Sequence, residues 1–136
     1  MNDFIVQLKR KHELLLNVLE LTRAQGELIK NDNTDALLSN IGKRQVLIDE
    51  LDGIQAELPD KETLRENSDC LQLITVVNGV LNEIQAQDKM NEEAALERMD
   101  YYREQIKKTN DGRRTVAGYD ALKPGEAQGS YINKNK

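Results

Sequence analysis

The stretch that decides the fold is residues 71–106, LQLITVVNGVLNEIQAQDKMNEEAALERMDYYREQI, and it predicts one long helix. Positions that alternate three and four residues apart lie on one face of a helix, and most of these positions are apolar. This stripe consists of Ile74, Val77, Leu81, Ile84, Asp88, Asn91, Ala95, Met99, Tyr102 and Ile106. It is aliphatic up to Ile84, polar at Asp88 and Asn91, and smaller or amphipathic afterwards. We therefore expect the first half to hold the other helices and the half beyond Asp88 to stay open for another chain.

Two shorter helices are predicted before the long one, over about Asp3–Lys30 and Thr34–Leu58. The apolar stripe of the first consists of Ile5, Leu8, His12, Leu15, Leu19, Thr22, Gly26 and Ile29, and we expect Leu16 and Leu28 to widen it. The turn-forming residues 31–33 separate the two helices, Thr34 is a candidate N-cap, and Pro59 ends the second helix. Because the connection is so short, the two helices must form an antiparallel hairpin.

The predicted fold class is all-α: an antiparallel helical hairpin plus a long third helix, with a flexible C-terminal tail. This plan is an elongated three-helix bundle or coiled coil. We expect residues 59–67 to form a loop or a short extra turn, Ser68 or Asp69 to cap the third helix, and residues 110–112 to end it. The predicted domains are therefore a helical bundle over residues 1–110 and a recognition tail over residues 111–136.

Four glycines fall inside the predicted helices, and each costs about 1 kcal/mol relative to alanine. They are Gly26, Gly42, Gly53 and Gly79. One interpretation is that they are tolerated surface positions or places where helices approach closely. The other is that the bundle is soft and can repack around a partner.

Charge is unevenly distributed along the chain. From Lys107 onward there are seven of the 19 basic residues and three of the 24 acidic ones, which leaves a body of 12 basic and 21 acidic residues. An acidic body argues against nucleic-acid binding, because phosphate contacts need concentrated Lys and Arg. The single cysteine, Cys70, cannot form an intramolecular disulfide. The first residues lack a signal-peptide pattern and no stretch is apolar enough to span a membrane, so we expect a cytoplasmic protein.

The C-terminal residues from Gly112 onward have the composition of a disordered segment, with frequent glycine and polar side chains. Against this background, Val116, Tyr119 and Leu122 stand three residues apart, and Tyr131 with Ile132 forms a second apolar spot. The tail is either a nondescript terminus or a recognition segment that orders on a partner. We favour the second interpretation.

The residues that enzymes need are sparse in this chain. The one histidine, His12, lies in the stripe of the first helix, and Cys70 has no second cysteine or histidine near it in sequence. No Glu-x-x-His motif accompanies Glu92, Glu93 and Glu97, so we expect no metal site, and we expect no cofactor or catalytic residue either. Two hypotheses remain. One is a structural coiled-coil module for homo-oligomerisation; the other is an adaptor whose exposed helix face binds another helical segment.

The polar residues Asp88 and Asn91 bear on this choice in two ways. If they are buried in the seam, they specify register or partner at a cost in stability. If the helix bends there instead, both face water.

The chain resembles the FlgN family of flagellar type III export chaperones over nearly its whole length. The resemblance is carried by Leu15, Leu16 and Leu19 followed by residues 21–25 (LTRAQ), by Leu37-Leu38, and by residues 43–45 (KRQ) leading to Leu47, Ile48 and Leu51. In the C-terminal part it is carried by Lys107, Lys108, Arg113, Arg114 and Tyr119, and by residues 130–134 (SYINK). The closing run is similar to an aromatic-Ile-Asp-Lys ending, with Asn133 in place of the Asp.

The resemblance implies a cytoplasmic, all-helical export chaperone. Such chaperones bind C-terminal helical segments of the hook-associated proteins of the hook–filament junction, prevent premature assembly, and deliver this cargo to the cytoplasmic domain of the export gate. A tail tyrosine docks on that gate, and the resemblance suggests Tyr119 first and Tyr131 second. We expect the cargo surface to consist of Met99, Tyr102, Ile106, Val116, Tyr119 and Leu122. Whether the protein at rest is a monomer or a homodimer stays open.

Overall fold

The computed structural model describes the backbone of residues 2–113 and the side chains of residues 3–110. These residues form α1 (Asn2–Lys30), α2 (Thr34–Glu57), a short α3 (Lys61–Arg65) and the long α4 (Ser68–Arg113), without a strand among them. The all-α prediction is confirmed. The chain divides between Glu92 and Glu93 into two compact units, and the described part of the second unit is the C-terminal part of α4. The predicted tail, residues 111–136, lies almost wholly outside the described residues, so the domain assignment stays a prediction.

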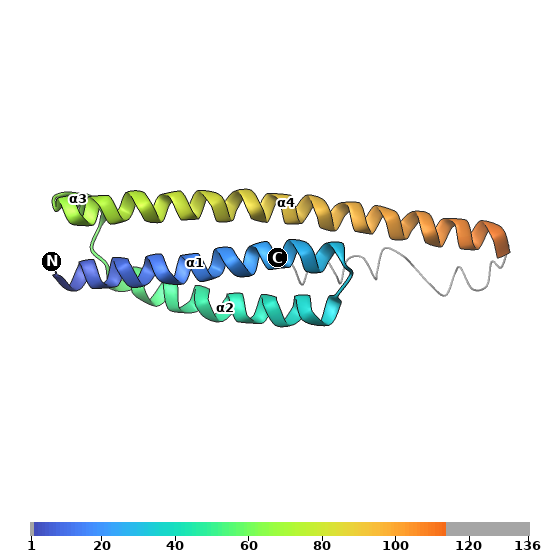
Figure 1. Cartoon of the computed structure of the whole chain (residues 1–136), viewed down its shortest axis with the longest axis horizontal. Coiled ribbons are helices and arrows are strands. Elements are labelled where there is room, and N and C mark those ends of the chain that lie inside the picture. Colours follow the sequence, from blue (N-terminus) through green and yellow to red (C-terminus); the bar gives the residue numbers. More distant parts are fainter. Residues whose placement is uncertain (1, 114–136) are drawn as a thin grey trace. The chain divides into compact units, whose positions relative to one another are not determined.

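In the first unit, α1 and α2 form the expected antiparallel hairpin, and α4 runs beside α1 (Figure 1). The turn between α1 and α2 contains Asp32 at φ 57°, a left-handed conformation that Asp tolerates better than most residues. α1 and α4 run parallel, since Leu8 packs with Ile74 near their starts whereas Thr22 and Asn91 meet further along. The long helix therefore uses its first half to cover α1.

Two apolar clusters hold the first unit together. The larger joins α1 and α4, with Leu47 and Leu51 of α2 packed against its edge; its buried members are Leu15, Val18, Leu19, Val77, Val80 and Ile84. The smaller lies at the other end of the unit, where α3 closes it; its buried members are Leu8, Leu64, Cys70 and Ile74. Full burial of such side chains stabilises a fold by about 1.5–3 kcal/mol each. These clusters are the core of the unit.

The widening of the α1 stripe differs from the prediction at Leu16, whereas Leu28 is half-buried. Leu16 is 44% exposed, and Leu14 and Val18, at 1% and 2%, are buried in its place. Because α1 contacts both α2 and α4, it needs an apolar face broad enough for two partners. The face broadens at Leu14 and Val18, which directly precede the stripe residues Leu15 and Leu19. Periodicity alone does not reveal on which side of the stripe the apolar face broadens.

The helix caps also lie one or two residues away from the predicted positions. Asn33 Oδ1 accepts the amide of Ala36 at 3.3 Å, so Asn33 rather than Thr34 caps α2. Asn67 Oδ1 accepts the amides of Asp69 and Cys70 at 2.9 and 3.1 Å, so Asn67 rather than Ser68 or Asp69 caps α4. Asparagine is at least as good an N-cap as serine, threonine or aspartate, and several candidates in a row leave the choice open.

Two further predictions concern residues 59–67, which precede α4, and the C-terminal end of α4. Residues 59–67 contain the short extra turn that was expected, α3, whose N-cap Asp60 accepts the amide of Thr63 at 2.9 Å. The expected stop at residues 110–112 is wrong, because α4 continues through them to Arg113. A single glycine inside a helix costs about 1 kcal/mol, which a helix of this length tolerates. Within the described residues, no helix is long and apolar enough to cross a membrane.

Candidate partner-binding site on the C-terminal part of α4

The polar interruption of the α4 stripe marks where the packed part of the helix ends. Asn91 is 6% exposed, and its Nδ2 donates to the carbonyl oxygen of Thr22 at 2.7 Å, while its Oδ1 accepts from Gln87 Nε2 at 2.9 Å. Asp88 accepts an ion-paired hydrogen bond from Arg44 of α2 at 2.9 Å. The alternative in which both residues face water is therefore wrong for Asn91, whereas the Asp88 side chain is 41% exposed and ion-paired. Asn91 is a buried seam residue that ties α4 to α1, and Asp88 ties it to α2.

Gly26 allows the close approach that this contact requires. A Cβ atom at Gly26 would lie 2.7 Å from Asn91 Oδ1, an oxygen that Gln87 already holds in place. Gly42, Gly53 and Gly79 have no atom within 4 Å of such a Cβ. The close-approach interpretation therefore holds for Gly26, and the tolerated-surface interpretation holds for the other three.

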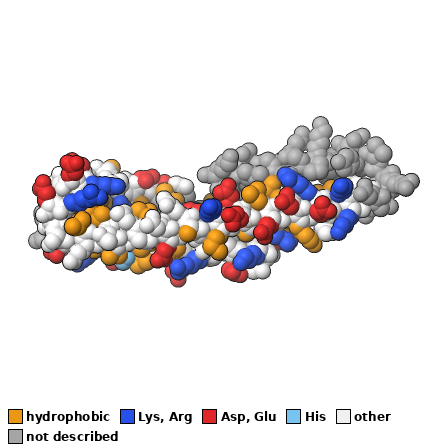
Figure 2. Space-filling view, turned by 90° about the horizontal axis from the view of Figure 1, so that it is seen from above, with side chains coloured by type: hydrophobic (Ala, Val, Ile, Leu, Met, Phe, Trp, Pro, Cys, Tyr) orange, Lys and Arg blue, Asp and Glu red, His pale blue; other side chains and the backbone are white. Residues whose placement is uncertain are grey.

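Beyond Glu92 the same helix carries large apolar side chains into solvent. Figure 2 shows apolar side chains interleaved with acidic and basic ones along this part of α4. The exposed large apolar side chains are Leu96 at 49%, Tyr101 at 48%, Tyr102 at 45% and Ile106 at 38%. An aromatic-rich set of this kind is typical of protein–protein contact surfaces, where tyrosine supplies large area at low entropic cost.

Arg98 holds the two tyrosines together. Its Cζ lies 4.5 Å from the ring centroid of Tyr101 and 5.3 Å from that of Tyr102, three and four residues further along the helix. The two rings meet edge to face, with centroids 5.7 Å apart and planes at 69°. Cation–π contacts at exposed sites contribute about 0.5–1 kcal/mol, which favours this arrangement of the rings over others by a small factor. We call Arg98, Tyr101 and Tyr102 the tyrosine cluster.

The structure places the predicted cargo residues in three different situations. Tyr102 and Ile106 are exposed on α4, as a docking surface requires, whereas Met99 is 7% exposed. Val116, Tyr119, Leu122 and Tyr131 lie outside the described residues. Sequence reasoning missed Tyr101 and Arg98, because a stripe read at three–four spacing passes over both. The signal that could have found them is an arginine three and four residues before a tyrosine pair.

The groups that could carry chemistry lie elsewhere and do not converge. Cys70 is a free thiol, fully buried in the smaller core cluster, and His12 is half-buried on α1. Within the described part of the chain, no three His, Cys, Asp or Glu side chains are grouped to hold a metal ion. What the tyrosine cluster and its apolar neighbours can do is bind a partner surface. No protein-family model, curated protein or solved structure matches this chain.

Proposed function

We propose that this protein is a FlgN-like export chaperone, which acts by binding rather than by catalysis. In this proposal its cargo is the C-terminal helical segments of flagellar hook-associated proteins, which it keeps from assembling early and delivers to the cytoplasmic domain of the export gate. Proposed cargo contacts are Tyr102 and Ile106 with Val116, Tyr119 and Leu122, now joined by Tyr101 and Leu96. The observation that carries the proposal is the exposed tyrosine cluster on α4, beyond the part that packs on the hairpin.

The physical support is that this surface suits an apolar helix stripe. Cargo segments that later assemble as helices expose such stripes beforehand. Burial of their apolar area contributes a gross transfer free energy of about 25 cal/mol per Å², from which the entropic cost of association is subtracted. The ring centroids of the two tyrosines lie 4.5 and 5.3 Å from Arg98 Cζ, and this contact favours their present arrangement, so somewhat less side-chain freedom is lost on binding. A surface arranged in this way can bind cargo reversibly without a deep pocket.

The test is co-purification of hook-associated protein C-terminal segments with the full-length protein and with the double variant Tyr101→Ala/Tyr102→Ala. We expect the double variant to bind on the order of 30-fold more weakly, a loss typical of aromatic hot spots. The matched control is Val76→Ala, which removes an apolar side chain that is 47% exposed in the packed half of the same helix. Equal binding by the double variant and the control would refute the tyrosine cluster as the cargo surface.

Gate docking is a separate part of the proposal. We expect Tyr119→Ala to weaken binding to the export gate's cytoplasmic domain while helicity measured by circular dichroism stays unchanged, with Tyr131→Ala as the second variant. If neither substitution changes binding to the gate, the tail tyrosines have no docking role. A loss of helicity instead would make Tyr119 a structural residue.

A second candidate function, a coiled-coil homo-oligomerisation module without cargo, is favoured by the same exposed apolar side chains on α4. Under this function, sedimentation of the protein alone gives a stable dimer or larger oligomer, and the Tyr101→Ala/Tyr102→Ala variant gives a monomer. Under the chaperone proposal, cargo binds whether or not the resting protein self-associates. Cargo capture therefore separates the two functions.

A further inference from the structure

A group of polar side chains lies inside the first unit, beyond Leu19 of α1 and Ile84 of α4, where the larger core cluster ends. It contains Thr22, Asn40 and Asn91, one from each of the three long helices, and these are 0%, 7% and 6% exposed. Buried polar groups are tolerated in folded proteins when their hydrogen bonds are made. We call this group and the side chains bonded beside it the polar layer; its members are Thr22, Asn40, Arg44, Gln87, Asp88 and Asn91.

Two atoms of the polar layer on α2 differ from the rest. Asn40 Nδ2 donates to the carbonyl oxygen of Leu21 at 3.1 Å, and Arg44 Nη2 donates to Asp88 Oδ2 at 2.9 Å. The other groups of the same two side chains, Asn40 Oδ1 and Arg44 Nε, are buried and have no hydrogen-bond partner within the described residues. Ordered water is a usual partner of buried polar groups that no protein group reaches.

The two unpaired atoms are complementary. Asn40 Oδ1 is an amide oxygen that accepts a hydrogen bond, whereas Arg44 Nε carries a proton that it can only donate. The two residues are four positions apart on α2, so their side chains leave the same face of the helix, with Cβ atoms about 5–6 Å apart. Asn40 is held toward α1 and Arg44 toward α4 by their other hydrogen bonds. The pair therefore presents one acceptor and one donor to a small ligand between them.

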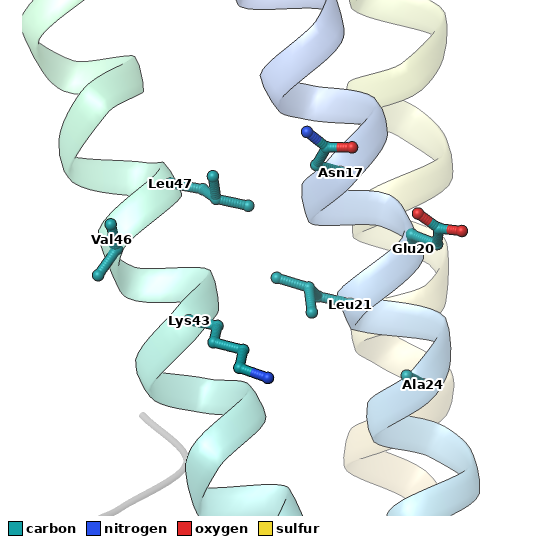
Figure 3. A pocket seen from close by; sticks show the side chains of 7 residues that line it. All are labelled: Asn17, Glu20, Leu21, Ala24, Lys43, Val46 and Leu47. Atoms are coloured by element: carbon teal, nitrogen blue, oxygen red, sulfur yellow. The ribbon is translucent and has the colours of Figure 1, made fainter.

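A shallow hollow between α1 and α2 adjoins the polar layer. Leu21, Lys43 and Leu47 are among the residues that line it. Figure 3 shows Leu21 and Leu47 pointing toward one another across the space between the two helices, with Lys43 extending from α2 toward α1. The carbonyl of Leu21 is the acceptor for Asn40 Nδ2, and Lys43 directly precedes Arg44. Solvent is therefore available next to the polar layer on this side.

We propose that one water molecule binds between Asn40 and Arg44, accepts a hydrogen bond from Arg44 Nε and donates one to Asn40 Oδ1. Buried waters make about two to four hydrogen bonds to groups that would otherwise stay unpaired. This water completes the hydrogen bonding of α2 in the polar layer and holds the Arg44 guanidinium where its Nη2 meets Asp88. The inference does not depend on the tyrosine cluster or on its proposed cargo.

The chemistry of the pair selects water over an ion. An anion accepts from Arg44 Nε but cannot donate to Asn40 Oδ1, and it would lie close to the carboxylate of Asp88. A cation is attracted by the amide oxygen but repelled by the guanidinium. A ligand that accepts on one side and donates on the other satisfies both atoms, and water is the smallest such molecule.

The test is nuclear magnetic resonance of the isotope-labelled full-length protein, observed at the Nε protons of arginine. We expect a cross-peak between Arg44 Hε and water with the sign of a water that tumbles with the protein, because an internal water stays bound longer than a surface water. Arg23 is the matched control, since its side chain is 61% exposed beside Glu83, and it should give no such cross-peak. A rotating-frame experiment separates this cross-relaxation from proton exchange. Absence of the cross-peak at Arg44, or an equal one at Arg23, would overturn the proposal.

Two neighbouring substitutions locate the water. Asn40→Leu keeps a similar side-chain volume but removes the acceptor, so the cross-peak at Arg44 Hε should disappear, whereas Ser39→Leu, at an exposed position, should leave it unchanged. Circular dichroism checks that both variants are folded. A cross-peak that survives in folded Asn40→Leu, or that is lost equally in Ser39→Leu, would show that Asn40 does not hold the water. The comparison of Arg44 with Arg23 needs no substitution, so it decides the proposal even if a variant does not fold.

Discussion

Between Ser68 and Glu92, α4 buries an apolar or amide side chain on most turns, ending at Asn91, which is 6% exposed. Between Glu93 and Asn110 the same helix buries Met99, and its other large apolar side chains are 38–49% exposed. Both parts have helical periodicity, but the first is aliphatic and faces α1 and α2, whereas the second is more amphipathic and presents the tyrosine cluster. The comparison teaches that periodicity identifies a face that can be buried, and that the neighbouring elements decide whether it is.

The largest expected difference between the two parts comes from one substitution made in each. Ile84→Ala should lower the free energy of unfolding by about 2–5 kcal/mol, because Ile84 is 6% exposed within the larger core cluster. Ile106→Ala should change it by about 0.5 kcal/mol, because Ile106 is 38% exposed. Urea unfolding followed by circular dichroism measures both. Equal losses would break the comparison, since they would mean that the second part is packed as tightly as the first.

The close approach at the end of the packed part is tested by a pair of glycine substitutions. Gly26→Ala should destabilise the protein by about 1–3 kcal/mol, because the new methyl group meets Asn91 Oδ1 at 2.7 Å. Gly79→Ala, with no atom within 4 Å, should stabilise it by up to about 1 kcal/mol through helix propensity. Thermal unfolding of both variants gives the signs. A gain in stability from Gly26→Ala would show that Asn91 moves aside freely.

The buried amide itself is tested by a matched pair of asparagines on α4. Asn91→Ala should cost about 1–3 kcal/mol, because the carbonyl of Thr22 loses the donor that lies 2.7 Å away in a buried site. Asn82→Ala, at an exposed position, should gain a few tenths of a kcal/mol, about what helix propensity supplies. Urea unfolding measures the difference. Were the two variants equally stable, Asn91 would not anchor the end of the packed part.

The smallest expected effect concerns Asp60, the N-cap of the short helix α3 that precedes α4. Hydrogen bonds from the side chain and then the amide of Thr63 lower the pKa of Asp60 below its ordinary value of 3.8. Since the folded-state pKa is below the unfolded one, this stabilisation is present above about pH 4 and is lost as pH falls through the folded pKa. Thermal unfolding at several pH values should therefore show a shallower acid decline for Asp60→Asn than for the control Asp52→Asn. Identical declines would mean that the cap contributes nothing.

Much of the fold follows from local patterns. The turn at residues 31–33, Pro59 and the apolar stripes predicted α1 and α2 to within one residue, because turn formation and amphipathic periodicity depend on near neighbours. The predicted change of character near residues 88–91 lies close to the boundary between Glu92 and Glu93. The end of α4 was predicted wrongly, because residues 110–112 permit a stop but do not require one.

The candidate site was less accessible to sequence reasoning. Tyr102 and Ile106 were selected by their stripe, but the stripe also selected Met99, which is 7% exposed. Arg98 and Tyr101 were passed over, although the guanidinium carbon of Arg98 lies 4.5 Å from the Tyr101 ring centroid. A stripe assigns residues to a face, whereas side-chain contacts between adjacent faces depend on rotamers that only the structure supplies.

The sequence by itself determined the all-α class, the hairpin and the position of the long helix, because helical periodicity and turn chemistry act between residues close together in the chain. Only the tertiary structure decided which polar side chains are buried, as at Asn91, and which glycine allows a close approach, as at Gly26. It also decided that the two tyrosines of the tyrosine cluster on α4 are exposed and lie against Arg98. Burial and exposure depend on the distance between helices that are remote in sequence, and no local pattern specifies that distance.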